Sequence, residues 1–252
     1  MTDWTRAGAR KKRKRSGFSV KKTVLSLMSF LLIGALCFLV FFTSLFEIRE
    51  IRLHGGRYLP FDSLRTAADD YIGSNIFTFP AGELEKSMTH YAEVYDVRFR
   101  RRLFHTLDCY FHERIPVALV SIAEMVGVDA LGVIIPQRTG LVSWDVDLPV
   151  ITGIKSDEIP KESGKIKLSK ALKVLELLKE FGFSPAEELS EIHLEMDDVI
   201  LVWMGKGTRI LMGKESFHER IRNFKAVYDV LEECESFPKS IDLRFERQVV
   251  IR

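Results

Sequence analysis

Residues 23–46 read TVLSLMSFLLIGALCFLVFFTSLF and contain no Asp, Glu, Lys, Arg or His. At about 1.5 Å of rise per residue, a helix of this length covers about 36 Å, enough to cross a hydrocarbon core of about 30 Å with some tilt. The sequence holds one such stretch, and some 200 residues with polar patterning follow it. We therefore expect one membrane anchor joined to one large folded region.

The residues before this stretch predict its orientation. Nine Lys and Arg residues lie between Arg6 and Lys22, and Asp3 is the only acidic residue there. Lys and Arg next to a membrane span stay on the cytoplasmic side. We expect a cytoplasmic basic tail over 1–22, an uncleaved signal anchor over 23–46, and a single-pass type II protein of the cytoplasmic (inner) membrane. Since the whole chain has a formal net charge of +2, residues 47–252 are net acidic.

Two other interpretations of the N-terminal region are weaker. The run KKRKR at Lys11–Arg15 could bind nucleic acid or direct nuclear import, but a basic run so close to a span is typical of a topology determinant that touches anionic lipid. We therefore expect no nucleic-acid partner. A cleaved signal peptide would have an apolar region of about 7–15 residues, and this one is longer and lacks a small-residue cleavage site.

The first block after the anchor, residues 47–116, predicts a small sheet under two helices. A strand containing Ile51 is followed by two short helical patterns, which begin near Pro60 and Pro80. Two alternating segments come next, and the apolar residues of the second are Leu107, Cys109 and Phe111. An alternation with period two and one apolar face is typical of a sheet covered on one side. The expected order is β-α-α-β-β.

The second block, residues 117–252, predicts a larger mixed-sheet β domain with two helices on one face. Short strands alternate with turn residues, and two helical patterns interrupt them, around Leu168–Phe181 and Phe217–Leu231. Gly182 marks the end of the first helix. We expect residues 155–167 to be a soft segment. The fold class is therefore α+β: a single transmembrane helix, a small β-α-α-β-β domain and the larger β domain.

No catalytic or metal-binding arrangement stands out in the sequence. The six His residues are scattered, and His218-Glu219 lacks the second His of a zinc-protease motif. The three Cys residues, Cys37, Cys109 and Cys234, have no metal-type spacing, and we interpret them as small buried apolar residues. Nucleophile-elbow, phosphate-loop and dinucleotide motifs are also missing. We expect a non-enzymatic protein without a metal or cofactor.

Six short motifs follow the anchor in order. They are Ile51–Gly55, Glu113-Arg114-Ile115-Pro116, Val128–Ile134 with Asp129 and Gly132, Leu148–Gly153, Met212-Gly213 and Ile241–Phe245. Their order, spacing and position after one span resemble the bacterial division proteins called FtsQ in some lineages and DivIB in others. The resemblance covers nearly the whole chain. It implies that residues 47–116 form a POTRA domain and that residues 117–252 form the FtsQ-type β domain.

Each motif also has a structural interpretation. Pro116 ends a strand and stiffens the joint to the next domain. Glu113 and Arg114 are either solvated neighbours on an edge or part of an ion pair at this joint. Gly132 favours a tight turn over a ligand, and Asp129 favours a turn acceptor over an acid catalyst.

The resemblance also implies a partner. In the family, the last helix and last strands of the second domain hold a membrane-distal segment of the small bitopic division protein FtsB (DivIC), which travels with FtsL. The aromatic residue after Asp-Leu-Arg lies in that contact, and its position here is Phe245. The residues expected to line or neighbour the contact are Arg244, Arg247, Val249 and Ile251. The alternation in Gln248–Ile251 favours an edge strand that could accept a partner strand.

The leading hypothesis is a scaffold of the division machinery that binds FtsB/FtsL-type partners outside the cytoplasmic membrane, links early and late division proteins to septal peptidoglycan synthesis, and is enriched at the septum. The alternative is a POTRA-type chaperone or adaptor in polypeptide export, although the sequence lacks the run of amphipathic strands of a membrane barrel. A membrane-anchored hydrolase of wall material is a third class. The sequence lacks the paired carboxylates, Ser/His set or metal set that it would need.

Overall fold

The computed structural model describes residues 20–56, 58–102, 105–136, 147–196, 198–203, 207–233, 237–245 and 248–252. The basic tail up to residue 19 and the predicted positions Asp197, Cys234 and Arg247 lie outside these residues. The chain divides into two compact units. The first holds the described part of Met1–Ile51 with Tyr71–Phe79 and Arg101–Leu107, and the second holds Arg52–Asp70, Pro80–Arg100 and Asp108–Arg252.

The apolar stretch forms helix α1 (Val20–Phe42), followed by a short 3-10 helix, η1 (Ser44–Phe46). Residues 21–42 are long and apolar enough to cross a membrane, and none of this window is buried against protein. The helix thus includes the start of the predicted span and ends four residues earlier than predicted. It ends early because Thr43 leaves the helical conformation and its hydroxyl donates to the carbonyl of Leu39.

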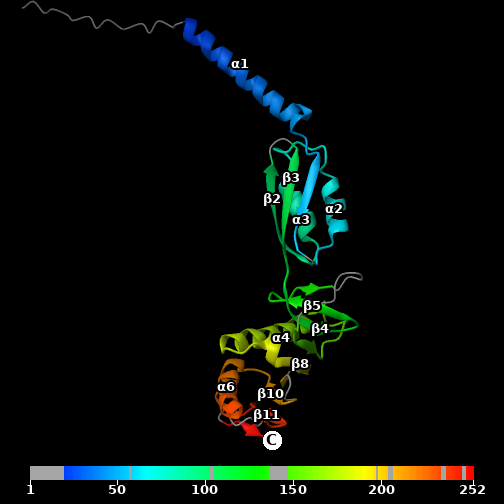
Figure 1. The fold of residues 1–252 in the computed structure, drawn as a ribbon, viewed down its shortest axis with the longest axis vertical. Coiled ribbons are helices and arrows are strands. Elements are labelled where there is room, and N and C mark those ends of the chain that lie inside the picture. Colours follow the sequence, from blue (N-terminus) through cyan, green and yellow to red (C-terminus); the bar gives the residue numbers. More distant parts are fainter. Residues whose placement is uncertain are drawn as a thin grey trace, which may run out of the picture. The chain divides into compact units, whose positions relative to one another are not determined.

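A three-stranded sheet and two helices follow, in the predicted order β-α-α-β-β (Figure 1). The elements are β1 (Glu50–His54), α2 (Phe61–Asp69), α3 (Ala81–Thr89), β2 (Val94–Arg102) and β3 (Thr106–Glu113), and the strand order is β1-β3-β2. The helices bury the apolar residues that their spacing predicts: Leu64 and Ala68 on α2, and Leu84 and Met88 on α3. Two prolines, Pro60 and Pro80, stand at the N-caps of these helices.

The middle strand β3 departs from the predicted alternation. Leu107 and Cys109 are buried as expected, but Asp108 between them is also fully buried. Its Oδ1 lies 3.4 Å from Nε2 of His54 on β1, and the His54 ring stacks on Tyr110 of β3 at a centroid distance of 4.8 Å. The face predicted to be solvated is therefore covered at Asp108, where the side chain of His54 from the neighbouring strand lies against it.

The remaining residues form a nine-stranded mixed sheet with the order β12-β11-β10-β9-β8-β7-β4-β5-β6. Its strands are β4 (Pro116–Ser121), β5 (Met125–Asp129), β6 (Ile134–Ile135), β7 (Val150–Thr152), β8 (Leu189–Glu195), β9 (Asp198–Trp203), β10 (Arg209–Gly213), β11 (Ser240–Asp242) and β12 (Val250–Ile251). Three neighbouring pairs are parallel, namely β4 with β7, β7 with β8, and β10 with β11. The other neighbours are antiparallel.

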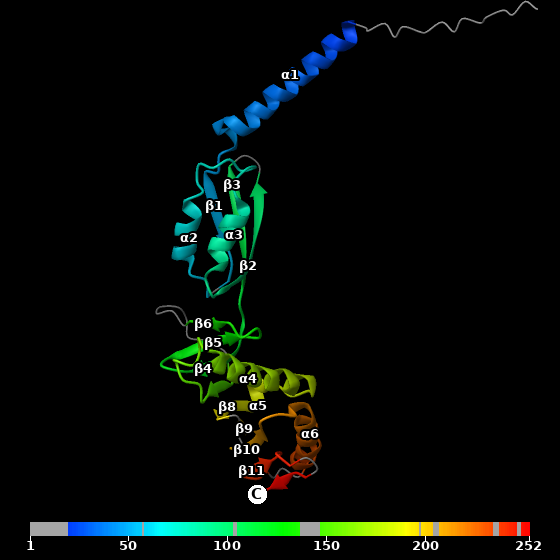
Figure 2. The same ribbon diagram turned by 180° about the vertical axis from the view of Figure 1, so that it is seen from behind.

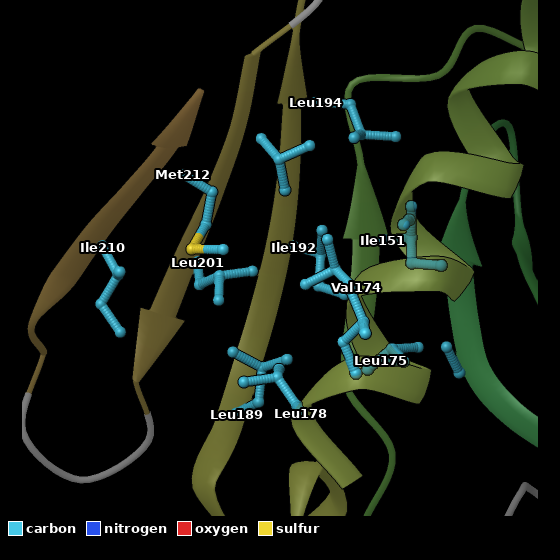
Figure 3. Close-up of a cluster of buried hydrophobic side chains, with 14 of the residues drawn as sticks. Ile151, Val174, Leu175, Leu178, Leu189, Ile192, Leu194, Leu201, Ile210 and Met212 are labelled. Atoms are coloured by element: carbon cyan, nitrogen blue, oxygen red, sulfur yellow. The ribbon is translucent and has the colours of Figure 1, made fainter. Parts of the chain in front are cut away.

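Helices α4 (Glu162–Glu180) and α6 (Phe217–Glu233) lie beside this sheet, and a short helix α5 (Pro185–Glu188) precedes β8 (Figure 2). One cluster of buried apolar side chains joins both long helices to the strands. Figure 3 shows Val174, Leu175 and Leu178 of α4 directed toward the side chains of β7 and β8. Aromatic rings extend this core at α6, where the ring centroids of Phe224 and of Trp203 on β9 lie 5.2 Å apart.

The N-terminal end of α4 corrects one expectation. Residues 155–167, predicted to be soft, form a turn and the first part of the helix. Lys167 Nζ pairs with Glu158 Oε2 at 2.9 Å, and Gly164 packs so closely on Glu158 that a Cβ would lie 2.1 Å from its carbonyl oxygen. The C-terminal end follows the prediction, since Gly182 has φ +84° and its N–H donates to Lys179.

The α+β class, the apolar N-terminal helix and the large mixed sheet are therefore confirmed. The two compact units do not coincide with a boundary at residue 116, and the assignment of 47–116 to a POTRA domain and of 117–252 to a separate β domain stays a prediction.

Candidate partner-binding edge

Strand β12 is the edge strand at one end of the nine-stranded sheet, and among the described residues it pairs only with β11. The N–H of Ser240 donates to the carbonyl of Arg252, and the N–H of Arg252 donates to the carbonyl of Ser240, both at 2.9 Å. Bonded and non-bonded pairs alternate along an antiparallel ladder. The next pair, Ile241 and Ile251, is therefore a non-bonded one, and the N–H and carbonyl of Ile251 face away from β11.

The predicted site residues take different positions around this edge. The side chains of Phe245 and Ile251 are 51% and 48% exposed. Val249 is half-buried and packs against the apolar core. Arg247 lies outside the described residues. Two exposed apolar side chains therefore accompany the open backbone edge.

Arg244 is bound within the protein. Its Nε donates to Asp242 Oδ1 at 2.9 Å and its Nη2 donates to Asp242 Oδ2 at 2.7 Å, while Nη1 lies 3.7 Å from Asp198 Oδ2. The hydrogen bonds from this guanidinium hold the pKa of Asp242 below its usual value. The side chain is about half exposed, and its bonds hold the charge of Arg244 beside Asp242 of β11 and Asp198 of β9.

A groove of about 380 Å³ lies between α6 and the two residues that precede β12. Gln248 and Val249 line one side, and five residues of α6 line the other: Glu219, Arg222, Asn223, Ala226 and Val227. The α6 residues were not among the predicted site residues. The apolar stripe of α6 that the sequence displays is core, as predicted, and the groove residues lie on another flank, where only Ala226 and Val227 interrupt the polar pattern.

No cluster of three or more His, Cys, Asp or Glu side chains in the described part of the chain could hold a metal ion. A larger hollow of about 790 Å³ lies along α4, and leucines and lysines dominate its lining. Its acidic lining residue, Glu176, forms an ion pair with Lys173 at 2.7 Å. None of the predicted site residues lines this hollow.

Comparison with known proteins identifies the family. The family model described as "Cell division protein FtsQ/DivIB, C-terminal" matches residues 118–244. A cell division protein FtsQ of Geotalea daltonii is 24% identical over 213 residues, which cover 83% of this chain and 77% of the relative. A second, from an Anaeromyxobacter species, is 24% identical over 75% of this chain and 65% of its own length.

A third protein of the same name, from a Geobacter species, is 27% identical over 62% of this chain and 58% of its own length. For the second and third relatives, the chain thus spans less than two thirds of their length. The family match covers the strands and both helices of the large sheet up to Arg244, and so includes the α6 flank of the groove. The chain therefore belongs to the FtsQ/DivIB family of cell-division proteins.

Proposed function

We propose that this protein is a non-enzymatic scaffold of the divisome that binds an FtsB/FtsL-type (DivIC/FtsL) partner at the edge strand β12. The observation that carries the proposal is the joint position of an open backbone edge, two exposed apolar side chains and the α6 groove. Main-chain hydrogen bonds to an added strand supply affinity, and side-chain pockets supply specificity. The α6 groove is placed to receive a side chain of the partner.

The backbone geometry gives this proposal a sharp test. Ile251→Pro removes an N–H that faces the open edge, and it leaves the two hydrogen bonds between Ser240 and Arg252 intact. Co-purification of the full chain with an FtsB/FtsL-type pair should be lost. Ile251→Val keeps the N–H and should retain the partner. Equal capture by both variants would show that the edge backbone takes no part.

The groove is tested separately by its side chains. Ala226 is exposed and lines the groove, so Ala226→Arg should fill it and weaken partner binding without disturbing the core. Glu232→Arg, on the same helix but outside the groove, introduces the same side chain as a control. If both variants bind as the unchanged protein does, the partner does not use α6.

The topology belongs to the same proposal. The basic tail lies in the cytoplasm, α1 crosses the membrane once, and both a POTRA domain over 47–116 and the β domain lie outside the cytoplasm, where the protein links other division proteins to septal wall synthesis. A reporter enzyme that needs an oxidising compartment should be active when fused after Arg252. Depletion should give filaments or undivided cells, whereas loss of outer-membrane proteins would support the export adaptor.

A further inference from the structure

The segment between α2 and α3 is bonded to the end of the membrane helix. Asn75 Nδ2 donates to the carbonyl of Val40 in the last turn of α1 at 2.7 Å. The N–H of Ile76 donates to the carbonyl of Phe46 at 2.8 Å, and Glu47 forms an isolated β-bridge with Asn75. All of these residues belong to the first compact unit.

These contacts satisfy backbone groups where water is scarce. The last carbonyls of a helix have no intrahelical donor, and leaving them unpaired in hydrocarbon is costly. Thr43 donates to the carbonyl of Leu39, and Asn75 serves the next carbonyl, that of Val40. The 23 residues of α1 cover about 34 Å against a hydrocarbon core of about 30 Å. A residue bonded to Val40 therefore lies near the membrane–water interface.

Exposed apolar side chains gather in the same unit. Ile72 is 47% exposed and Phe77 is 45% exposed. Phe46 and Phe77 meet with their ring centroids 5.3 Å apart, which joins the segment to the chain leaving α1. Single exposed apolar residues are ordinary on a protein surface. Here Phe77 contacts the chain that leaves a membrane span, and the bilayer is the apolar phase next to that span.

An arginine completes this surface. Arg101 Nε donates to the carbonyl of Ile76 at 2.8 Å, and its guanidinium lies over the ring of Phe79 at 5.2 Å from the centroid. Its side chain is exposed, and the two contacts fix its plane beside the segment. A guanidinium held in this way can donate paired hydrogen bonds to a phosphate group. The attraction proposed here comes from this placed donor.

We propose that residues Tyr71–Phe79, with Arg101, form a second membrane contact, which we call the membrane foot. Ile72 and Phe77 enter the interfacial layer of the leaflet from which α1 emerges, and Arg101 binds the phosphate oxygens of phospholipid headgroups. The foot fixes the direction in which the chain leaves α1, because Asn75 and Ile76 bond it to both ends of the connection. This proposal rests on α1 crossing the bilayer.

Depth-dependent quenching tests the foot in the full chain. The protein is placed in phospholipid nanodiscs that carry a nitroxide either near the headgroup or deep in the acyl chain. Phe77→Trp should be quenched mainly by the shallow nitroxide, after subtraction of the unchanged protein's signal. Leu32→Trp, in the middle of α1, should be quenched mainly by the deep one. Val230→Trp, exposed on α6, controls for quenching of any exposed tryptophan.

The possible outcomes distinguish a failure of the membrane-foot proposal from a failure of α1 to span the bilayer. If Leu32→Trp is quenched and Phe77→Trp is not, the foot is overturned while α1 still spans. If neither is quenched, the span fails and the foot fails with it. Adding Arg101→Gln to Phe77→Trp should remove most of the shallow quenching, whereas Arg65→Gln, exposed on α2, should leave it unchanged. Quenching that survives Arg101→Gln would overturn the role of the headgroup phosphate.

Discussion

Arg114 Nη1 donates to Asp129 Oδ2 across 2.7 Å, and so joins two family motifs that lie 15 residues apart. The other oxygen, Asp129 Oδ1, accepts the N–H groups of Leu131 at 3.0 Å and Val133 at 2.8 Å. One carboxylate thus shapes the turn after β5 and holds the arginine that precedes β4. Of the two interpretations of Arg114 left open by the sequence, the ion pair is the one that the structure shows, and Asp129 is the turn acceptor expected.

Breaking this pair should destabilise the protein strongly, because both side chains are largely buried. Arg114→Ala leaves a buried carboxylate without its counter-charge and should lower the free energy of unfolding by on the order of 3 kcal/mol. Arg98→Ala removes an exposed pair with Asp96 and should cost less than about 1 kcal/mol. Urea unfolding of the full chain in detergent, followed by circular dichroism, measures both. Similar losses in the two variants would contradict a structural role for the Arg114 pair.

Two glycines with the same backbone conformation provide a second test. Gly153 and Gly182 both have φ +84°. A Cβ on Gly153 would lie 2.1 Å from the carbonyl oxygen of Leu194, whereas a Cβ on Gly182 would meet nothing within 4 Å. Gly182→Ala should therefore cost about 1–2 kcal/mol, the backbone strain alone. Gly153→Ala should cost clearly more, because β8 must move. Equal midpoints of thermal unfolding would contradict this reasoning.

The pair Asp242–Arg244 should make the stability of the folded protein depend on pH. Hydrogen bonds from Arg244 hold the pKa of Asp242 below its usual value, so the folded state favours the ionised carboxylate. The resulting stabilisation of the folded state is fully present above the pKa of Asp242 in the unfolded chain, about 3.9. It is lost as the pH falls through the lower pKa of Asp242 in the folded state. Asp242→Asn should therefore be less stable than the unchanged protein at neutral pH, and the gap should close in acid. Melting temperatures measured across the pH range would reveal a constant gap if Asp242 is not the group involved.

The thiol of Cys109 should not react with alkylating reagents in the folded protein. Burial, with a smaller effect of the neighbouring Asp108 charge, raises its pKa to about 12, so the reactive thiolate is scarce at pH 8. Alkylation with iodoacetamide, read peptide by peptide in a mass spectrometer, should leave Cys109 unmodified until urea unfolds the sheet. Rapid labelling under native conditions would mean that β3 opens locally.

The spacing of apolar residues was sufficient to predict those elements whose packing depends mainly on their own residues. The apolar stripes of α4 and α6 predicted the faces that pack on the large sheet, and Gly182 marked a helix end because few residues other than glycine adopt its conformation. The segment 155–167 failed because its order depends on contacts between residues several positions apart, the Lys167–Glu158 pair and the close approach of Gly164. Local composition does not display such contacts.

At the candidate partner-binding edge, too, only part of the arrangement could be predicted from the sequence. The alternation in Gln248–Ile251 predicted an edge strand, and β12 is the edge strand at one end of the large sheet. The parallel pairing of β10 with β11, with α6 as the crossover, brings the helix next to the last strand. As a result, Ala226 and Val249 line the same groove. The sequence pattern of neither segment predicts that the two residues lie together.

Both edge strands of the large sheet, β6 and β12, are only two residues long. Short edges are one way in which sheet proteins avoid joining edge to edge with their own copies. A long open edge would allow copies to join edge to edge into fibres. A two-residue edge gives too few hydrogen bonds for copies to polymerise. Under the proposed function, a partner strand would bind β12 through few main-chain hydrogen bonds and would add side-chain contacts in the α6 groove, whereas a second copy of the chain would gain only the short edge.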